Sequence, residues 1–190
     1  AGGGLPRTVI FDQGYNCSVS PDGRWLAYGR GRTPWWRQHY RGSASRDIWM
    51  RRVEGGRSYR IVTSPYDDDR PMWSADGKTV YFVSERGDSV ANIWRVGVDL
   101  PESGEDGDPG AVGEPVQVTR HDRDGVQMAR ISSDGSLIAY EWDARVWKLS
   151  LPGGAPEEVV IEAPSDLKWN DDLIMNMTSG VQDFAFSPDE

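Results

Sequence analysis

Residues 70–96, RPMWSADGKTVYFVSERGDSVANIWRV, contain three short strand patterns separated by turns. Residues 72–74 form an apolar run, residues 75–78 form a turn that includes a glycine, and β-branched and aromatic residues fill 79–84. After a second turn, residues 92–96 alternate in polarity as a half-buried strand does. The stretch therefore predicts a β-meander, and its parts recur on both sides of it.

The Ser-x-Asp-Gly turn of this stretch recurs along the chain. Its aspartates stand at positions 22, 76 and 134, and a shortened copy ends the series at 189, so the intervals are 54, 58 and 55 residues. Each complete turn leads into a strand pattern and then into a strand that contains a tryptophan: 25–28 and Trp49, 80–83 and Trp94, 137–140 and Trp147. A fourth strand is expected at 59–63, 116–119 and 158–161, and another at 8–10. Four strands at a nearly constant period are typical of propeller blades.

The predicted fold is all-β, a partial β-propeller of about three four-stranded blades with incomplete blades at both ends. We expect residues 1–190 to form one propeller segment, with modules at 16–63, 72–119 and 128–161 and the start of a fourth at 183–190. An open array exposes a sheet face at each end. The missing blades are therefore expected from further chain of the same protein or from another copy.

Two predictions of burial follow from this register. The tryptophans occupy equivalent strand positions, which suits packing between blades, so they are expected in the core: Trp49, Trp94 and Trp147. Cys17 is the one cysteine of the chain, which excludes an internal disulfide, and it is expected to be a buried strand thiol.

Composition excludes several classes of protein. A chain with 37% hydrophobic residues and nine tryptophans is too apolar for a disordered segment. The formal net charge of −9 argues against a nucleic-acid partner, which needs a dense basic face. No apolar run is long enough for a membrane span.

Three stretches interrupt or join the repeats. Residues 29–46, GRGRTPWWRQHYRGSASR, are expected to be a long loop, and the acidic, glycine-rich residues 101–113 are expected to be a mobile surface loop. Residues 64–70, SPYDDDR, suggest a calcium loop, but the ligand spacing and the terminal Glu of such loops are absent. A solvated turn is the preferred interpretation, and no metal or other cofactor is predicted.

The loop at 29–46 is the candidate binding site. Aromatic rings interleaved with guanidinium groups could stack on peptide side chains or pair with a carboxylate. They could equally pack against the chain itself, and both alternatives remain open. The candidate residues are Trp35, Trp36, Arg37, His39, Tyr40 and Arg41.

Catalysis is not expected within this segment. A hydrolytic triad needs a base beside its nucleophile, and the chain has only two imidazoles, His39 and His121. Neither lies in a recognisable nucleophile motif, and a Gly-x-Ser-x-Gly elbow is absent. His121, among charged residues in a loop, is expected to be an exposed turn residue.

Four stretches in order resemble a known family. They are PWWRQHYRGSASRDIW at 34–49, DDDRPMWSADGKTVYFVSERG at 67–87, residues 124–135, and TSGVQDFAFSPD at 178–189. The repeats resemble those of the TolB and tricorn group, and these stretches resemble the N-terminal propeller of bacterial tricorn-type serine peptidases. The resemblance covers nearly the whole chain.

The resemblance implies a non-catalytic propeller segment that guides a peptide or protein substrate and takes part in domain assembly. PDZ and peptidase domains of the same chain would be its partners, and the parent would be a hydrolase. It also implies an exported, periplasmic protein, with a cytoplasmic one as the alternative. The rival hypothesis is a stand-alone TolB-like propeller that binds proteins and belongs to no enzyme.

Overall fold

The computed structural model describes residues 14–34, 37–87, 90–102 and 107–162. Contacts divide the chain into two units, residues 1–160 and 161–190, and all the described strands lie in the first. Within the described ranges the structure is all-β, and no helix there is long and apolar enough to cross a membrane. The strands are β1 (Tyr15–Val19), β2 (Trp25–Arg30), β3 (Asp47–Arg52), β4 (Ser58–Val62), β5 (Asp68–Trp73), β6 (Thr79–Ser84), β7 (Asn92–Asp99), β8 (Gly110–Gln117), β9 (Gln127–Ile131), β10 (Leu137–Trp142), β11 (Arg145–Ser150) and β12 (Pro156–Glu158).

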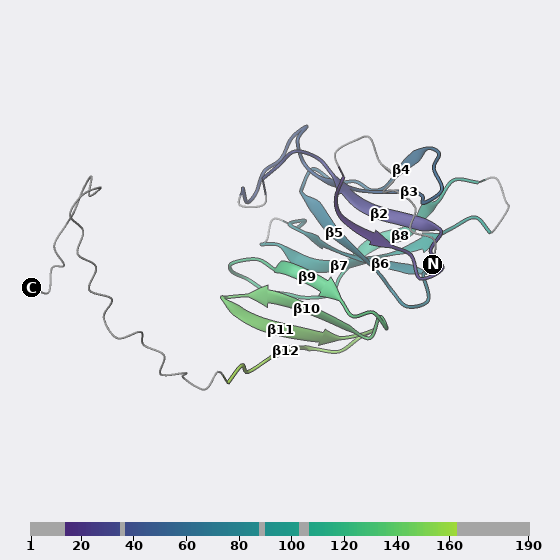
Figure 1. Ribbon diagram of the computed structural model, residues 1–190. Helices are drawn as coiled ribbons and strands as arrows, with labels where there is room; N and C mark the ends of the chain where they lie inside the picture. Colours follow the sequence, from purple (N-terminus) through teal and green to yellow (C-terminus); the bar gives the residue numbers. More distant parts are fainter. Residues whose placement is uncertain (1–13, 35–36, 88–89, 103–106, 163–190) are drawn as a thin grey trace, which may run out of the picture. The chain divides into compact units, whose positions relative to one another are not determined.

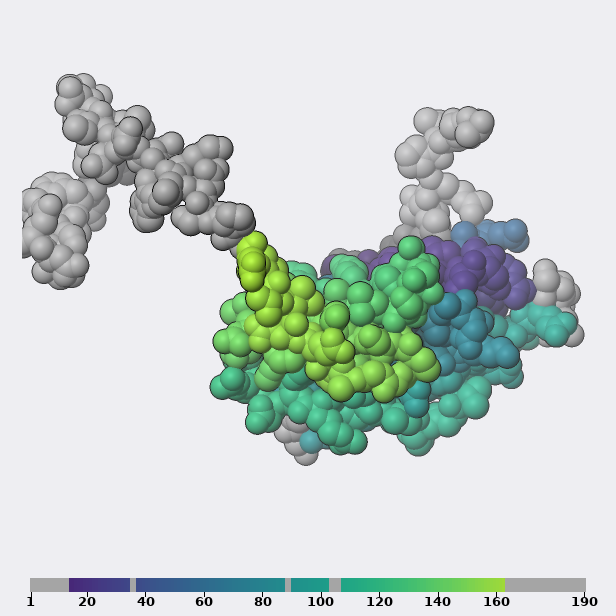
Figure 2. Space-filling view, turned by 90° about the horizontal axis from the view of Figure 1, so that it is seen from below, coloured from purple at the N-terminus to yellow at the C-terminus, as the bar shows by residue number. Residues whose placement is uncertain are grey.

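These strands form three antiparallel sheets of four strands, and each sheet follows the order of the chain. We call β1–β4 the first sheet, β5–β8 the second and β9–β12 the third (Figure 1). The first strands β1 and β5 contact each other, and β5 contacts β9. In Figure 2 the third sheet, green to yellow, forms the near face of the described part. This architecture confirms the predicted all-β, partial propeller.

The Ser-x-Asp-Gly turn has one geometry in all three sheets. The serine hydroxyl donates to the aspartate Oδ1 at 2.6 Å and accepts the backbone N–H of the first residue of the next strand at 2.9–3.1 Å. The residue after the glycine donates its N–H to the same Oδ1 at 3.0 Å. The glycines have φ between 67° and 73°, a left-handed conformation that side chains disfavour. Each turn thus satisfies its own polar groups and reverses the chain.

Successive turns also pack against each other. A Cβ on Gly77 would lie 3.6 Å from Pro21 of the preceding turn, which is ordinary contact. A Cβ on Gly135 would lie 2.7 Å from the backbone nitrogen of Ala75, which is too close. Nothing lies within 4 Å of the corresponding position on Gly23. The glycine is therefore required by conformation in the first turn and by both conformation and space in the third.

The pairing of the second and third strands gives the register between sheets. In each sheet the tryptophan of the third strand pairs with an aromatic residue of the second strand: Trp49 with Tyr28, Trp94 with Phe82 and Trp147 with Tyr140. The predicted alignment of 80–83 with 25–28 is therefore wrong by one residue. Phe82, rather than Val83, corresponds to the two tyrosines, because β6 begins at Thr79 directly after its turn.

The core consists of two apolar clusters between neighbouring sheets. Between the first and second sheets, Trp25, Met50 and Phe82 are fully buried. Between the second and third, Ile93 and Ile138 are fully buried. Each such side chain contributes about 1.5–3 kcal/mol relative to an exposed one. Packing between sheets, rather than within one, therefore stabilises the array.

The tryptophans predicted to be in this core are only half-buried. A guanidinium group lies over two of them: Arg30 is 4.6 Å from the ring centroid of Trp49, and Arg86 is 5.6 Å from that of Trp94. Trp147 packs edge-on against Trp142 at 5.0 Å. These rings therefore line the borders of the core. The expectation of a buried Cys17 is wrong, since this residue of β1 is exposed.

The fourth strands differ from the prediction. Strand β8 begins at Gly110, so residues 110–113 of the expected loop belong to a strand, and most of that strand is exposed. Its pairing with β7 shifts register between Arg95 and Gly97, which accommodates residues of low strand propensity. Strand β12 covers 156–158 rather than 158–161. The strands expected at 8–10 and in the fourth module at 183–190 lie outside the described residues.

Candidate functional site

The connections at the end of the sheets opposite the Ser-x-Asp-Gly turns differ from one sheet to the next. The longest joins β2 to β3 and is residues 31–46, which we call the arginine loop (Figure 1). Its two limbs are closed at the base, because the backbone N–H groups of Arg32 and Thr33 both donate to the Ala44 carbonyl oxygen at 2.9 and 3.1 Å. The buried Thr33 hydroxyl donates to the same oxygen at 2.7 Å. Hydrogen bonds therefore hold the base of the loop closed where it leaves the first sheet.

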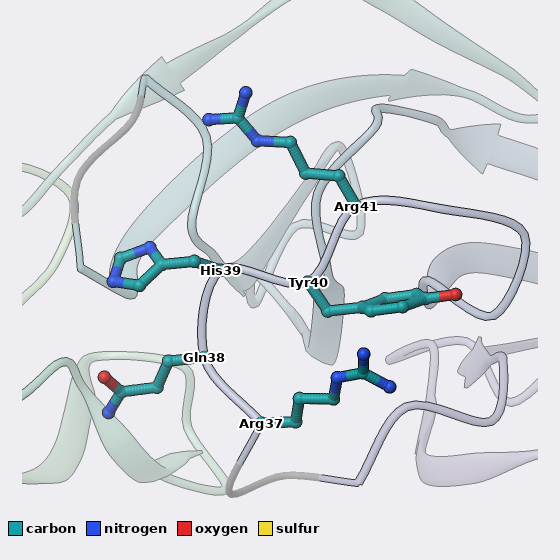
Figure 3. A pocket seen from close by; sticks show the side chains of 5 residues that line it. All are labelled: Arg37, Gln38, His39, Tyr40 and Arg41. Atoms are coloured by element: carbon teal, nitrogen blue, oxygen red, sulfur yellow. The ribbon is translucent and has the colours of Figure 1, made fainter.

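The tip of the loop folds back on itself (Figure 3). The Arg37 guanidinium lies over the Tyr40 ring at 4.4 Å, and the Tyr40 hydroxyl oxygen accepts the Ala44 N–H at 3.4 Å. Arg41 extends in another direction and lies over the ring of Tyr66 at 4.7 Å. Because both cations face aromatic rings, the tip is ordered by stacking and keeps positive charge at its surface.

A carboxylate of the second sheet supports the loop. The backbone N–H of His39 donates to Glu85 Oε2 at 2.6 Å, directly after the end of β6. Burial raises the pKa of Glu85, although the hydrogen bond from His39 opposes the rise. The loop of the first sheet therefore reaches across the end of the second.

Three adjacent aspartates anchor the base of the loop, which corrects the prediction of a solvated turn at 64–70. Asp67 accepts the backbone N–H of Arg46 at 2.8 Å. Asp68 is fully buried; its two carboxylate oxygens accept hydrogen bonds from Arg86 Nη2, at 3.0 and 2.8 Å, and Oδ2 also accepts one from the Ser64 hydroxyl at 2.9 Å. Asp69 accepts from Arg46 Nη1 at 2.5 Å. Each carboxylate accepts a hydrogen bond from a different donor group. These hydrogen bonds offset the cost of placing three adjacent acids at the start of β5.

Burial shifts the pKa of two of these acids. It raises the pKa of Asp67 and of Asp68, against the hydrogen bonds and positive charges that lower them. The turn aspartates behave oppositely: the hydrogen bonds from Ser132 and Ser136 lower the pKa of Asp134 to about 2. The pKa values of Asp67 and Asp68 at one end of the sheets and of Asp134 at the other are thus shifted in opposite directions.

Hollows surround the arginine loop. An open one of about 600 Å³ is lined by residues 37–41 (Figure 3). A smaller cavity of about 80 Å³ lies under the loop and is lined by charged residues that include Arg37, Arg46, Arg70, Asp67, Asp69 and Glu85. A third, of about 340 Å³, lies between Gln38 and residues of the third sheet. The loop thus borders all three sheets.

The structure brings together four of the six predicted binding residues. Arg37, His39, Tyr40 and Arg41 share one loop tip and line the open hollow. Trp35 and Trp36 lie outside the described residues. Sequence reasoning missed Arg70 and Glu85, which come to the loop from the second sheet. The run of three aspartates indicated only that cationic partners lie nearby, and these are Arg46 and Arg86.

His121 is not the exposed turn residue that was expected. Its ring stacks on Trp142 at 4.0 Å, and its Nε2 lies 3.1 Å from the Tyr140 hydroxyl. Burial lowers the pKa of His121. Trp147 approaches the same imidazole edge-on at 6.0 Å. The residue is therefore part of an aromatic cluster that closes one end of the third sheet.

Solved structures share this fold. A protein assigned as TolB from Agrobacterium tumefaciens is 23% identical, with a TM-score of 0.60 over 82% of this chain and 52% of its own. TolB from Acinetobacter baumannii is 18% identical, with a TM-score of 0.51 over 76% of this chain and 31% of its own. The present chain thus spans about half of the first and a third of the second.

The tricorn protease is a more distant match, 15% identical with a TM-score of 0.39 over 72% of this chain and 21% of its own. That likeness supports no conclusion by itself. No protein-family model and no curated protein sequence matches the chain. The comparisons therefore define a TolB-like propeller fold.

Proposed function

We propose that this chain is a non-catalytic propeller segment of a tricorn-type serine peptidase, and that its arginine loop helps to guide peptide substrates. The sequence resemblance at 34–49 and 67–87 supports the parent. The observation that carries the binding role is the loop itself. Glu85, Asp67 and Asp69 hold the loop in place through hydrogen bonds, and the side chains of Arg37 and Arg41 at its tip line an open hollow.

Preorganisation is the physical reason to assign binding to this loop. A long loop with a closed base and stacked side chains loses little conformational entropy when a ligand arrives. Guanidinium groups suit carboxylates, and tyrosine offers a stacking surface. The peptide, the missing blades and the PDZ and peptidase domains are the partners of this proposal, and it implies an exported protein.

The test uses the full-length protein and two substrates. If the loop guides peptides, Arg37→Ala with Arg41→Ala lowers kcat/KM for a long peptide about tenfold, the loss expected from one charge-assisted contact. Hydrolysis of a short chromogenic substrate, which reaches the nucleophile directly, stays unchanged. If the variant keeps the wild-type kcat/KM for the long peptide, or loses the same factor on both substrates, the guiding role is refuted.

The stand-alone alternative is tested by sequencing the gene beyond the codon for Glu190. PDZ and peptidase sequence there supports the proposal, whereas closing blades followed by a stop codon support a TolB-like binding propeller. In that second case the same loop variant would be examined for protein binding, because no hydrolysis would exist to measure.

A further inference from the structure

The first strands β1, β5 and β9 share a bulge. In each of them the pairing with the next strand shifts register, and the residue four positions before the turn serine is left-handed: Asn16 (φ 50°), Arg70 (φ 54°) and Met128 (φ 50°). None of the three is glycine, so the conformation is strained. Because the bulge recurs in all three sheets, it belongs to the fold. What changes from sheet to sheet is the side chain that it presents.

In the first sheet the side chain at the bulge makes hydrogen bonds within the protein. The Asn16 amide donates to both carboxylate oxygens of Asp69, at 3.1 and 3.0 Å. Asp69 also accepts from Arg46 and from the backbone N–H of Arg70, at 2.5 and 2.8 Å. These donors occupy the Asp69 carboxylate, so it is not a strong partner for the neighbouring Arg70 side chain.

Arg70 is in a different situation. Among the described residues, its guanidinium makes one hydrogen bond, from Nη2 to the thioether of Met128 at 3.6 Å, and thioether sulfur is a weak acceptor. Burial lowers the pKa of Arg70, and the charges of Arg130 and Arg46 add to this effect against the opposing Asp69. A half-buried cation beside two others is costly unless an anion joins it.

Two further arginines lie near Arg70: Arg37 lines the same cavity, whereas Arg130 is exposed and is not among the residues that line it. Arg130 lies on the adjacent strand β9, and within the described part of the chain its guanidinium donates only to the Ala129 carbonyl oxygen, at 2.9 Å. Arg37 of the arginine loop shares the 80 Å³ cavity with Arg70. We call Arg37, Arg70 and Arg130 the inner arginine cluster. A guanidinium group has five donors, and most of the donors of this cluster make no hydrogen bond within the described residues, although Asp67, Asp69 and Glu85 line the same cavity.

We propose that the inner arginine cluster binds a carboxylate group of an acidic peptide, with Arg70 as its central residue. The inference rests on the proposed peptide binding and adds the chemical group that is recognised. The cavity has the volume of about two or three water molecules, enough for a carboxylate on a short stem. Three protein carboxylates line the same cavity, so a single negative charge fits there better than the double charge of a phosphate.

The carboxylate could come from a Glu or Asp side chain or from a peptide C-terminus. Three fluorescent peptides of one length separate these sources: one with three Glu and an amidated end, its Gln isostere, and the Gln peptide with a free C-terminus. Binding to the whole chain is measured by fluorescence anisotropy at two salt concentrations. Binding through a carboxylate weakens as the salt concentration rises, whereas binding of the amidated Gln isostere does not depend on salt.

The variants are chosen so that the fold survives. Arg70→Asn places at the bulge the residue that the first sheet carries there as Asn16, and asparagine tolerates a left-handed backbone. Arg130→Gln removes the neighbouring charge. Arg145→Gln is the matched control, since Arg145 is an exposed arginine of the third sheet that pairs with Glu158 at 3.0 Å. Thermal melts verify that each variant is folded.

Arg70→Asn should weaken binding of a carboxylate peptide about tenfold, Arg130→Gln less, and Arg145→Gln not at all. The peptide that shows this loss identifies the source of the carboxylate. If the wild type binds all three peptides and Arg70→Asn changes none of them, the carboxylate site is refuted while peptide binding stands. If the wild type binds no peptide, both proposals fail.

Discussion

The two ends of the three sheets are built on different principles. At one end, the turns at Ser20, Ser74 and Ser132 repeat the same hydrogen bonds at nearly the same distances. At the other end each connection is distinct, and the arginine loop extends from the first sheet to residues of the second and third. A repeated end can be shaped by the fold alone. An end whose parts all differ is where one particular function can be built.

The largest expected effect concerns an anchor at the loop end. Asp68→Ala leaves the nearly buried guanidinium of Arg86 without its carboxylate, which costs about 3–5 kcal/mol of unfolding free energy. Denaturant unfolding at neutral pH measures the loss. Asp47→Ala is the control, because its partner Arg60 is largely exposed and the change should cost less than about 1 kcal/mol. Equal costs would show that the loop end is not anchored by Asp68.

The second prediction concerns the turn end. Gly23→Ala and Gly135→Ala both place a side chain at a left-handed residue, which costs about 1–2 kcal/mol. Only Gly135→Ala also meets the backbone of Ala75, at 2.7 Å, which adds about 1–3 kcal/mol of overpacking. Thermal unfolding of the two variants gives the difference. If both lose the same stability, the turns do not pack on one another.

The third prediction is the smallest and concerns the acids at the two ends. Asp134 has a lowered pKa of about 2, so its stabilising effect is present above its ordinary pKa and is lost as pH falls from about 4 to 2. Glu85 has a raised pKa, so its ionisation costs stability, and that cost appears as pH rises through its folded value. Carboxyl titration by NMR should give a midpoint near 2 for Asp134 and a midpoint above the ordinary glutamate value for Glu85. The reverse order would contradict the assigned environments.

The same division explains what sequence could predict. Turns and strands recur, so the position of each Ser-x-Asp-Gly copy revealed the sheets and the all-β class. The error of one residue at 80–83 arose because an apolar pattern was aligned in place of the turn, although β6 begins at Thr79, directly after Lys78. Strand β8 was placed too late because Gly and Pro at an exposed sheet edge look like a loop.

The site was predictable only within one loop. Arg37 and Tyr40 lie close in sequence, and their stacking needs no distant contact. Glu85 and Arg70 reach the site from another sheet, and no local pattern links them to the loop. The aspartates at 67–69 were misinterpreted because their partners, Arg46 and Arg86, are about twenty residues away on either side. Pairing over that distance depends on how sheets meet.

The most direct test of the division measures stability and binding on the same variants of the whole chain. Arg37→Ala with Arg41→Ala should leave the thermal midpoint nearly unchanged and weaken peptide binding about tenfold. Ser20→Ala removes both hydrogen bonds of a buried hydroxyl at the turn end, so it should cost about 1–3 kcal/mol and leave the affinity of the folded protein unchanged. If the arginine variant loses stability and keeps its affinity, the loop serves packing alone and the proposed division is wrong.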